Sequence, residues 1–334
     1  MKKLFGTDGI RELATNDIFK RNSLNILSKA ILDNGKNKKI ALGRDTRKSS
    51  PIIEKIFIES LKNQGAHVYL LGLISTPALS YLTKRLNCNL GIIISASHNT
   101  YQFNGIKFFN ENGEKLSDKN EKKIENKFFK FNKNKIINLK SGKVINIKQR
   151  ENYYKTKVIS TLKIKRINNK KVVVDCANGS TYKLAKDIFT KFKIKAILIN
   201  NKPNGTNINY RCGSLYPQNI IKAVKKYSAD FGISFDGDGD RVGVIDNKGN
   251  EIYSDKVGLL IARNLASSYK KEKFVVDVKS TGLFEKDKIL LENQCKTIYW
   301  KTGHSHIKRK VNELKALAGF EKSGHFFFNK PLGY

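Results

Sequence analysis

Short apolar runs typical of strands alternate along the chain with amphipathic stretches typical of helices. A run at residues 38–45 leads into a stretch at 50–66 whose apolar residues recur at helical spacing, and a second strand-like run follows at 67–72. A helical stretch at 75–87 then precedes three consecutive isoleucines at 92–94. This alternation predicts an α/β fold in which helices flank a parallel or mixed sheet.

The same alternation starts twice more further along the chain. Residues 118–150 are rich in Lys, Asn and Glu and predict a surface helix followed by a connector. A second cycle opens at 170–180 and ends at 229–246, and a third begins near Tyr253, with no low-complexity linker between them. We therefore predict three tandem mixed α/β domains, named domains I, II and III, at residues 1–147, 148–246 and 247–334.

The composition is that of a globular chain with more than one core. With 334 residues, 40% of them hydrophobic, the chain can form two or three domains of about 100 to 150 residues each. No run approaches the ~18 apolar residues of a membrane span, and the first residues show no signal-peptide core, so we expect a cytoplasmic protein without membrane association. The four cysteines form no CxxC pair, which predicts packed, reduced thiols.

The net charge of +35 raises the question of nucleic-acid binding. Only 11 of the 64 basic residues are arginine, and the lysines are spread along the whole chain. Because base and phosphate recognition favours the bidentate geometry of arginine, the pattern indicates a general enrichment in lysine, and we expect no specific nucleic-acid partner. A basic nucleic-acid binder stays open as an alternative. The charge also favours small phosphorylated anions.

Three aspartates separated by single glycines form the most specific local signal. Asp236, Asp238 and Asp240 lie in the sequence FDGDGDRVGV, where a turning backbone can aim three carboxylates at one point. An EF-hand calcium loop would need Gly at its sixth position and Glu at its twelfth, where this chain has Arg241 and Asn247. An acidic turn without a metal would leave three repelling carboxylates. The pattern therefore predicts a site for a hard divalent cation, Mg²⁺.

The polar sequence SASHN at residues 95–99 interrupts an apolar run at the end of a predicted strand. A Mg²⁺ ion held by three carboxylates keeps room for a phosphate oxygen and neutralises charge during phosphoryl transfer. Ser97 is therefore the candidate acceptor or donor of a phosphoryl group. Neither a P-loop nor a GxGxxG motif is present in the sequence, so the donor need not be a nucleotide.

Five motifs occur in the order found in the α-D-phosphohexomutases, a family that this sequence resembles over its whole length. They are FGTDGIR at 5–11, GRDTRKSS at 43–50, SASHN at 95–99 with NGIK at 104–107, DGDGDR at 236–241 and EKSGH at 321–325. Members of this family interconvert hexose 1- and 6-phosphates through a phosphoserine and a bound hexose 1,6-bisphosphate, using Mg²⁺. The resemblance implies sugar phosphates as partners, with Mg²⁺ and an activating hexose 1,6-bisphosphate as cofactors.

The resemblance also implies a role for residues at matching positions. Ser97 would be the phosphoserine, and its phosphate would complete a Mg²⁺ shell with Asp236, Asp238 and Asp240. Lys107 would transfer protons, and Arg11 and His98 would line the same centre as further catalytic residues. The implied substrate-binding residues are Lys301, His304, Glu321, Ser323, His325 and Arg241. A zinc cluster of His304, His306 and His325 is the alternative for the histidines, but a Gly-His-Ser-His loop favours hydrogen bonds to a polyhydroxyl ligand.

The chain departs from the family pattern in three places. Glu12 and Thr100 stand where members usually have Gly and Pro. The sequence also ends where members continue into a fourth domain that holds the non-reacting phosphate. We therefore expect that domain to be absent and note that domain III could be incomplete.

Different parts of the chain resemble mutases with different sugar preferences. Up to about residue 230 the sequence resembles phosphoglucosamine mutases, whereas the later loops, which touch sugar hydroxyls in the family, resemble phosphomannomutase/phosphoglucomutases. We therefore predict a phosphomannomutase/phosphoglucomutase, with a phosphoglucosamine mutase and a truncated, non-catalytic sugar-phosphate binding protein as alternatives. The oligomeric state is expected to be monomer or dimer.

Overall fold

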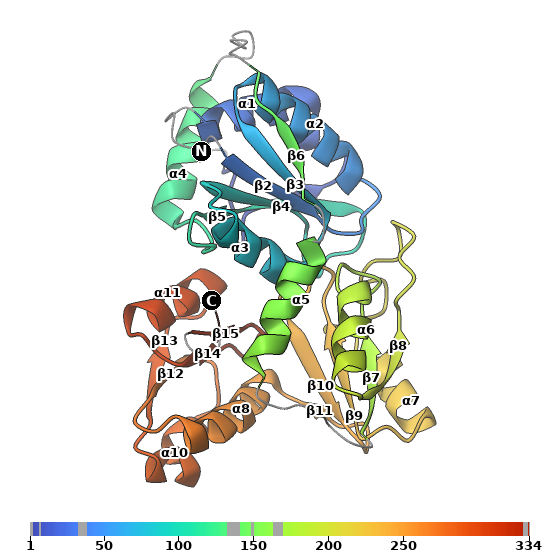
Figure 1. Ribbon diagram of the computed structural model, residues 1–334, viewed down its shortest axis with the longest axis vertical. Coiled ribbons are helices and arrows are strands. Elements are labelled where there is room, and N and C mark those ends of the chain that lie inside the picture. Colours follow the sequence, from blue (N-terminus) through green and yellow to red (C-terminus); the bar gives the residue numbers. More distant parts are fainter. Residues whose placement is uncertain are drawn as a thin grey trace.

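The protein folds into three β-sheets that follow one another along the chain, each flanked by helices. The computed structural model describes residues 3–6, 8–32, 39–131, 141–147, 150–162, 170–329 and 333. Figure 1 shows the first sheet above the other two, which lie side by side below it. The predicted fold class, three tandem mixed α/β domains, is confirmed. The predicted start of domain II at residue 148 and part of the predicted connector, residues 132–140, lie outside the described residues.

Domain I has a six-stranded sheet in the order β1-β5-β4-β2-β3-β6. Its strands are β1 (Ile10–Leu13), β2 (Lys39–Arg44), β3 (His67–Leu73), β4 (Leu90–Ile94), β5 (Phe103–Asn110) and β6 (Val144–Asn146). Its helices are η1 (Asp17–Phe19), α1 (Arg21–Leu32), α2 (Ser50–Asn63), α3 (Thr76–Arg85) and α4 (Asp118–Lys130). Leu24, Phe57 and Ile124 bury α1, α2 and α4 in one core, while Leu79 and Leu82 bury α3 in a second core.

Domain II has a five-stranded sheet in the order β11-β10-β9-β7-β8. Its strands are β7 (Lys171–Asp175), β8 (Lys195–Ile199), β9 (Phe231–Phe235), β10 (Val242–Asp246) and β11 (Glu251–Ile252). Helix α7 (Gln218–Lys226) packs on Val173 through Ile220 and Val224, and α6 (Tyr182–Lys191) packs on Val172 and Val174 through Ala185. Because side chains alternate along a strand, these two helices cover opposite faces of the sheet.

Domain III has a four-stranded sheet in the order β13-β12-β14-β15. Its strands are β12 (Lys273–Asp277), β13 (Lys296–Trp300), β14 (Ala318–Phe320) and β15 (Phe326–Phe328). Its helices are α8 (Ser254–Ser268), α9 (Leu283–Lys286), α10 (Lys288–Glu292) and α11 (His304–Glu313). Helix α8 packs on Phe274 and Phe320 through Leu259 and Ala262, and α11 packs on Val275 from the other face.

The three sheets share one strand arrangement. In each, a central strand (β2, β7 or β12) lies parallel to the next strand of the chain on one side and to the third strand on the other. A fourth strand (β5, β10 or β15) then pairs antiparallel with the third. The link between the third and fourth strands therefore leaves the carboxyl edge of the parallel strands. We call these links the serine loop (95–102), the metal loop (236–241) and the sugar loop (321–325).

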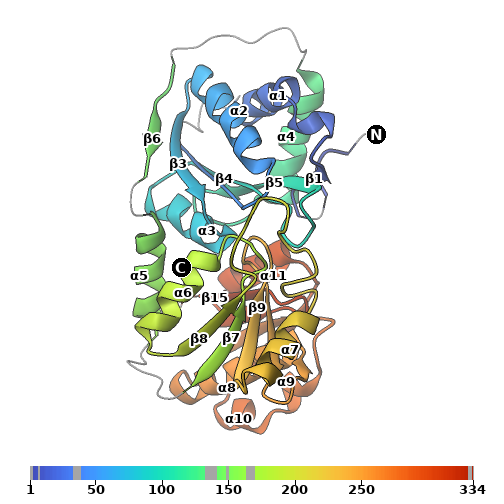
Figure 2. The same cartoon turned by 90° about the vertical axis from the view of Figure 1, so that its right-hand side faces the viewer.

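Helix α5 (Arg150–Thr161) connects the first two domains, because it packs against both α3 and α6. Figure 2 shows it along the side of the molecule, below β6. The sequence did not predict β6, since a three-residue edge strand with an exposed Val144 carries no apolar pattern. The four cysteines are buried and free, as predicted. None of the described helices combines the length and hydropathy that a bilayer span requires.

Candidate active site

The three loops meet at one place between the three domains. The Ser97 Oγ of domain I donates a hydrogen bond of 2.6 Å to Asp236 Oδ2 of domain II. His325 Nε2 of domain III lies 3.4 Å from Asp240 Oδ1 of domain II. The sequence-predicted residues Ser97, Asp236 and His325 are therefore neighbours in space, although they lie far apart in the chain.

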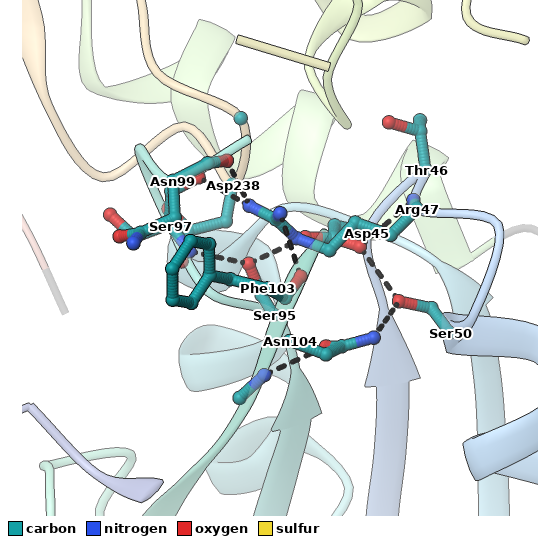
Figure 3. Close-up of polar contacts among 12 residues, drawn as sticks. Asp45, Thr46, Arg47, Ser50, Ser95, Ser97, Asn99, Phe103, Asn104 and Asp238 are labelled. Atoms are coloured by element: carbon teal, nitrogen blue, oxygen red, sulfur yellow. Dashed lines mark hydrogen bonds and ion pairs between the residues drawn. The ribbon is translucent and has the colours of Figure 1, made fainter. Parts of the chain in front are cut away.

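The serine loop holds Ser97 in a backbone conformation that is unusual for a side chain with a Cβ atom. Ser97 has a φ of 51° and is fully buried, directly after the apolar strand β4. Its N–H donates to Ser95 Oγ at 3.0 Å, and Ser95 Oγ in turn donates to Asp45 Oδ2 at 2.7 Å. The loop therefore depends on a carboxylate from the end of β2 (Figure 3).

The metal loop is held by one of its own aspartates. Asp236 Oδ1 accepts the backbone N–H groups of Gly239 at 3.1 Å and of Asp240 and Arg241 at 3.2 Å. A carboxylate that accepts three N–H groups of its own turn fixes that turn locally. The side chains of Asp236, Asp238 and Asp240 consequently point to one place, where one oxygen from each lies within 4.8 Å of the others.

This donor set fits a divalent cation. Within the described residues, Asp238 Oδ1 is buried without a hydrogen-bond partner, which is costly for a carboxylate oxygen unless a cation compensates it. Burial and the neighbouring carboxylates raise the pKa of Asp236 well above its usual value, and burial and Asp240 raise that of Asp238. The raised pKa values show that the three carboxylates repel one another. An ion that prefers oxygen ligands, such as Mg²⁺, relieves this repulsion.

Lys107 of β5 supplies the positive charge at this centre. Its Nζ lies 2.9 Å from Asp8 Oδ2 and 3.0 Å from both Asp238 Oδ2 and Asp240 Oδ2. Burial alone disfavours the ammonium, but the three carboxylates outweigh burial and raise the pKa of Lys107 well above its usual value. Lys107 is therefore protonated in this arrangement, and it pulls the pKa of Asp240 well below its usual value against the effect of burial.

Arg11 and His98 lie beside the same centre. Arg11 contacts Asp8 Oδ2 at 3.1 Å and donates to Asn99 Oδ1 at 3.1 Å, which places its guanidinium against the serine loop. His98 Nδ1 lies 3.3 Å from Ser97 Oγ. Burial and then the charges of Arg241 and Arg11 lower the pKa of His98 to about 4, so its ring is neutral near pH 7.

The sugar loop joins domain III to the metal loop. His325 Nδ1 lies 3.1 Å from Glu321 Oε2 and 2.9 Å from Ser323 Oγ, while its Nε2 faces Asp240. Glu321 Oε1 accepts the Gly303 N–H at 2.7 Å, which links the loop to the start of α11. Burial opposes a charge on His325, but Asp240 outweighs burial and raises the pKa to about 10.

The remaining predicted residues lie around this loop. The rings of His304 and His325 are 5.1 Å apart, and burial together with His325 lowers the pKa of His304 to about 3. Lys301 is exposed at the end of β13, and Arg241 Nε has no hydrogen-bond partner among the described residues. Among the described residues, Asp236, Asp238 and Asp240 are grouped closely enough to hold a metal ion. His304, His306 and His325 do not form such a group, so the alternative zinc cluster is not formed.

Several buried residues at the site were not assigned a role from the sequence. A buried aspartate ends or follows the central strand of each sheet: Asp45, Asp175 and Asp277. Asp45 holds Ser95, and Asp277 Oδ2 accepts the Lys322 N–H of the sugar loop at 3.1 Å. A signal was present, since Asp175 and Asp277 directly follow an apolar run and Asp45 follows one after Gly43 and Arg44, and this recurrence could have identified them. Arg47 lies in the motif GRDTRKSS at 43–50, but neither it nor Asn209 was assigned a role from the sequence.

Comparisons with known proteins agree with this geometry. The profiles described as "Phosphoglucomutase/phosphomannomutase, alpha/beta/alpha domain I", "domain II" and "domain III" match residues 2–135, 152–249 and 253–332. The chain is 39% identical to a phosphoglucosamine mutase of Caldicellulosiruptor saccharolyticus, over 97% of this chain and 74% of the relative. It is 41% identical to a phosphoglucosamine mutase of Buchnera aphidicola, over 97% of this chain and 72% of the relative.

The fold is shared with solved structures at lower identity. A putative phosphomannomutase from Thermus thermophilus superposes with a TM-score of 0.87 at 22% identity, covering 98% of this chain and 76% of that structure. The similarity extends through all three sheets, because nearly the whole chain is aligned.

Proposed function

Because the chain belongs to the phosphoglucomutase/phosphomannomutase family, the α-D-phosphohexomutases, we propose that it moves a phosphoryl group between the 6- and 1-positions of a hexosamine phosphate through Ser97. The observation that carries this proposal is the 2.6 Å hydrogen bond from Ser97 Oγ to Asp236, inside a cluster of three aspartates. A serine hydroxyl at a carboxylate cluster suited to Mg²⁺ is an arrangement that supports phosphoryl transfer.

The aspartates would hold the metal ion and the serine would hold the phosphate. Asp236, Asp238 and Asp240 are the proposed Mg²⁺ ligands, together with an oxygen of phosphorylated Ser97. A bound Mg²⁺ supplies neutralisation of the negative charge on the transferring group. A phosphoserine carries roughly −1.5 to −2 charges, so the nearby cations Lys107, Arg11 and Arg241 stabilise it as well.

Protons must move in each half of the reaction. In one half the sugar hydroxyl attacks and loses a proton while Ser97 Oγ departs and gains one; in the other half Ser97 Oγ attacks and loses a proton while the sugar oxygen gains one. We assign Lys107 the proton exchange at the sugar oxygen: it accepts a proton from the attacking hydroxyl in one half and returns it to the departing sugar oxygen in the other. A cation bound by Asp238 and Asp240 would offset the carboxylate charge that otherwise raises the pKa of Lys107. His98, neutral and 3.3 Å from Ser97 Oγ, is assigned the role of accepting a proton at the serine side.

The sugar loop and its neighbours would bind the substrate. Glu321, Ser323 and His325 offer both donors and acceptors to sugar hydroxyls, and the exposed Lys301 and the nearby His304 extend this surface. This combination of hydrogen-bond donors and acceptors suits a sugar that binds first in one orientation and then in the other, so that each of its two phosphate positions faces Ser97 in turn. The predicted domain boundaries at residues 147 and 246, the monomer or dimer and the cytoplasmic location remain predictions.

Relatives at 39% and 41% identity favour glucosamine phosphate over the mannose and glucose phosphates that we predicted first. The first prediction depended on the loops that follow residue 230, whereas the alignment with phosphoglucosamine mutases extends over 97% of the chain. We therefore propose glucosamine 6-phosphate and glucosamine 1-phosphate as the preferred pair.

Turnover with each sugar tests this proposal. The purified chain, with Mg²⁺ and a hexose 1,6-bisphosphate, is assayed on glucosamine, glucose and mannose 6-phosphates beside Ser97→Ala. We expect the highest kcat/KM with glucosamine 6-phosphate and no turnover by the variant. Binding of these sugars without any isomerisation would overturn the catalytic proposal and favour the binding-protein alternative.

A further inference from the structure

Two side chains outside the proposed chemistry hold the backbone of the serine loop from two different domains. One is Arg47, which follows β2 in domain I, and the other is Asn209, from the loop that follows β8 in domain II. Both are almost completely buried, at 0% and 2% exposure, so neither can reach a substrate without rearrangement.

Arg47 uses all five of its side-chain N–H groups inside the protein. Its Nε donates to Asp45 Oδ2 at 2.8 Å, and its Nη2 donates to the carbonyls of Ser97 at 2.9 Å and Asn99 at 2.7 Å. Its Nη1 donates to the carbonyls of Phe103 at 3.0 Å and Thr100. Figure 3 shows the guanidinium between Asp45 and the loop. No donor is left for a phosphate, and Asp45 balances the charge.

Asn209 donates to two of the same carbonyls from the opposite domain. Its Nδ2 lies 2.7 Å from the Ser97 carbonyl oxygen and 2.9 Å from that of Asn99. Each of these two oxygens thus accepts one bond from domain I and one from domain II, which uses both of its lone pairs. The serine loop is the layer between the two domains at this point.

The metal loop rests directly on this arrangement. A Cβ atom built on Gly237 would lie 2.6 Å from Asn209 Nδ2 and 2.8 Å from the Ser97 carbonyl oxygen. Only glycine therefore lets the metal loop approach the serine loop this closely. Asn209 therefore contacts both loops at the point where they approach each other.

We propose that Arg47 and Asn209 are positioning residues for phosphoryl transfer. They turn the Ser97 and Asn99 carbonyls toward the interdomain N–H groups and hold the Ser97 hydroxyl against the metal loop. A phosphoryl group with roughly −1.5 to −2 charges would be repelled by carbonyl oxygens that faced it. Donors that are already in place need no reorganisation during the reaction. The inference rests on the proposed role of Ser97.

Asn209→Gly is the sharpest test, with Asn178→Gly as its matched control. Both asparagines have left-handed backbones, with φ values of 56° and 49°, which glycine adopts without strain. Among the described residues, the Asn178 side chain bonds only within domain II, where it accepts from the Lys202 N–H at 3.1 Å and donates to the Asn207 carbonyl at 3.4 Å and to Cys212 Sγ at 4.0 Å. The two variants therefore differ in whether the interdomain bonds are lost.

The first readout is the single-turnover rate at which glucose 1,6-bisphosphate phosphorylates the enzyme. We expect Asn209→Gly to slow this step by about 10- to 100-fold, since small misplacements of reacting groups have effects of this size, while KM changes little. Asn178→Gly should stay within about twofold of wild type, because the Asn178 side chain makes no bond to the serine loop among the described residues. Equal rates for the two variants would overturn the inference.

The second readout needs no activity. Amide hydrogen exchange of the serine loop should become faster in Asn209→Gly than in Asn178→Gly, because the loop loses two carbonyl anchors. If wild type takes up no phosphate, the proposed function of Ser97 fails, and the exchange comparison alone decides whether the two side chains position the loop. Unchanged exchange in Asn209→Gly would contradict the inference in either case.

Discussion

The serine loop and the metal loop occupy equivalent places in their sheets, yet they are held in different ways. Each joins a parallel third strand to an antiparallel fourth strand. The metal loop is fixed by its own Asp236, which accepts three N–H groups within five residues. The serine loop is fixed by Arg47 and Asn209, which come from other parts of the chain. The metal loop also accepts bonds from Thr76 and Lys107 of domain I, but its turn carries its own carboxylate anchor, whereas the serine-loop carbonyls are held by side chains from outside that loop.

The largest effect is expected when the metal loop loses a carboxylate. Asp238→Asn removes a charge at the oxygen that has no hydrogen-bond partner within the described part of the chain. Turnover should fall by about 10²- to 10⁴-fold, since a metal ion contributes several kcal/mol of charge stabilisation. Calorimetric titration with Mg²⁺ should show weaker binding. Asp246→Asn, at the far end of β10, is the control, and equal losses in both variants would contradict the assignment.

The second largest effect is expected when the serine loop loses Arg47, which donates to three of its carbonyl groups and to one at the start of β5. Arg47→Met leaves Asp45 buried without its cation and removes one hydrogen bond from each of four carbonyls, two of which keep a bond from Asn209, so the free energy of unfolding should fall by about 3–5 kcal/mol. Denaturant titration measures it. Arg241→Met, on the metal loop, should change stability by less than about 1 kcal/mol, because its Nε bonds to nothing among the described residues. Similar losses for both arginines would remove the contrast between the loops.

A smaller effect should follow from separating the two loops without removing a functional group. Gly237→Ala places a Cβ against Asn209 and the Ser97 carbonyl, which should lower stability by about 1–3 kcal/mol. Phosphorylation of Ser97 should slow while Mg²⁺ affinity is retained, since the three carboxylates remain. Gly282→Ala is the control because a Cβ there meets nothing within 4 Å. Unchanged phosphorylation in Gly237→Ala would show that the close approach is unnecessary.

The smallest effect is a pH dependence at the contact between domains I and III. Lys308 of α11 donates to the Gly113 carbonyl at 3.0 Å and Ser80 Oγ at 3.3 Å, and burial, partly offset by Glu114, lowers its pKa from 10.5 to about 8. Between these values the unfolded chain binds more protons, so stability rises with pH over this window. The free energy of unfolding, compared between wild type and Lys308→Met at pH 7.5 and 10, should show a rise of about 1 kcal/mol that the variant lacks, less than the ~3 kcal/mol of the full shift because Lys308 is only partly buried. Parallel pH profiles would show that Lys308 does not titrate there.

The contrast between the loops also explains what the sequence could predict. Asp236, Asp238 and Asp240 were found because their spacing and their glycines contain the geometry that the loop adopts. Ser97 was found because a polar break after three isoleucines is unusual at the end of a buried strand. Each of these two signals is contained in a stretch of about ten residues.

Other parts of the site depend on tertiary contacts that no local pattern encodes. Arg47 and Asn209 are 162 positions apart, and only the docking of domain II on domain I brings them to the same carbonyls. Family resemblance supplied Lys107, whose three carboxylate partners come from two domains. The short edge strand β6 and the preferred sugar were likewise not determined by local patterns.

The measurement that tests the central claim most directly is the intact mass of the chain before and after incubation with glucose 1,6-bisphosphate and Mg²⁺, beside Ser97→Ala. The account predicts that wild type gains one phosphoryl group and that the variant gains none. A wild-type chain that gains no mass, or a variant that gains the same mass, would contradict the assignment of Ser97 as the residue that carries the phosphoryl group.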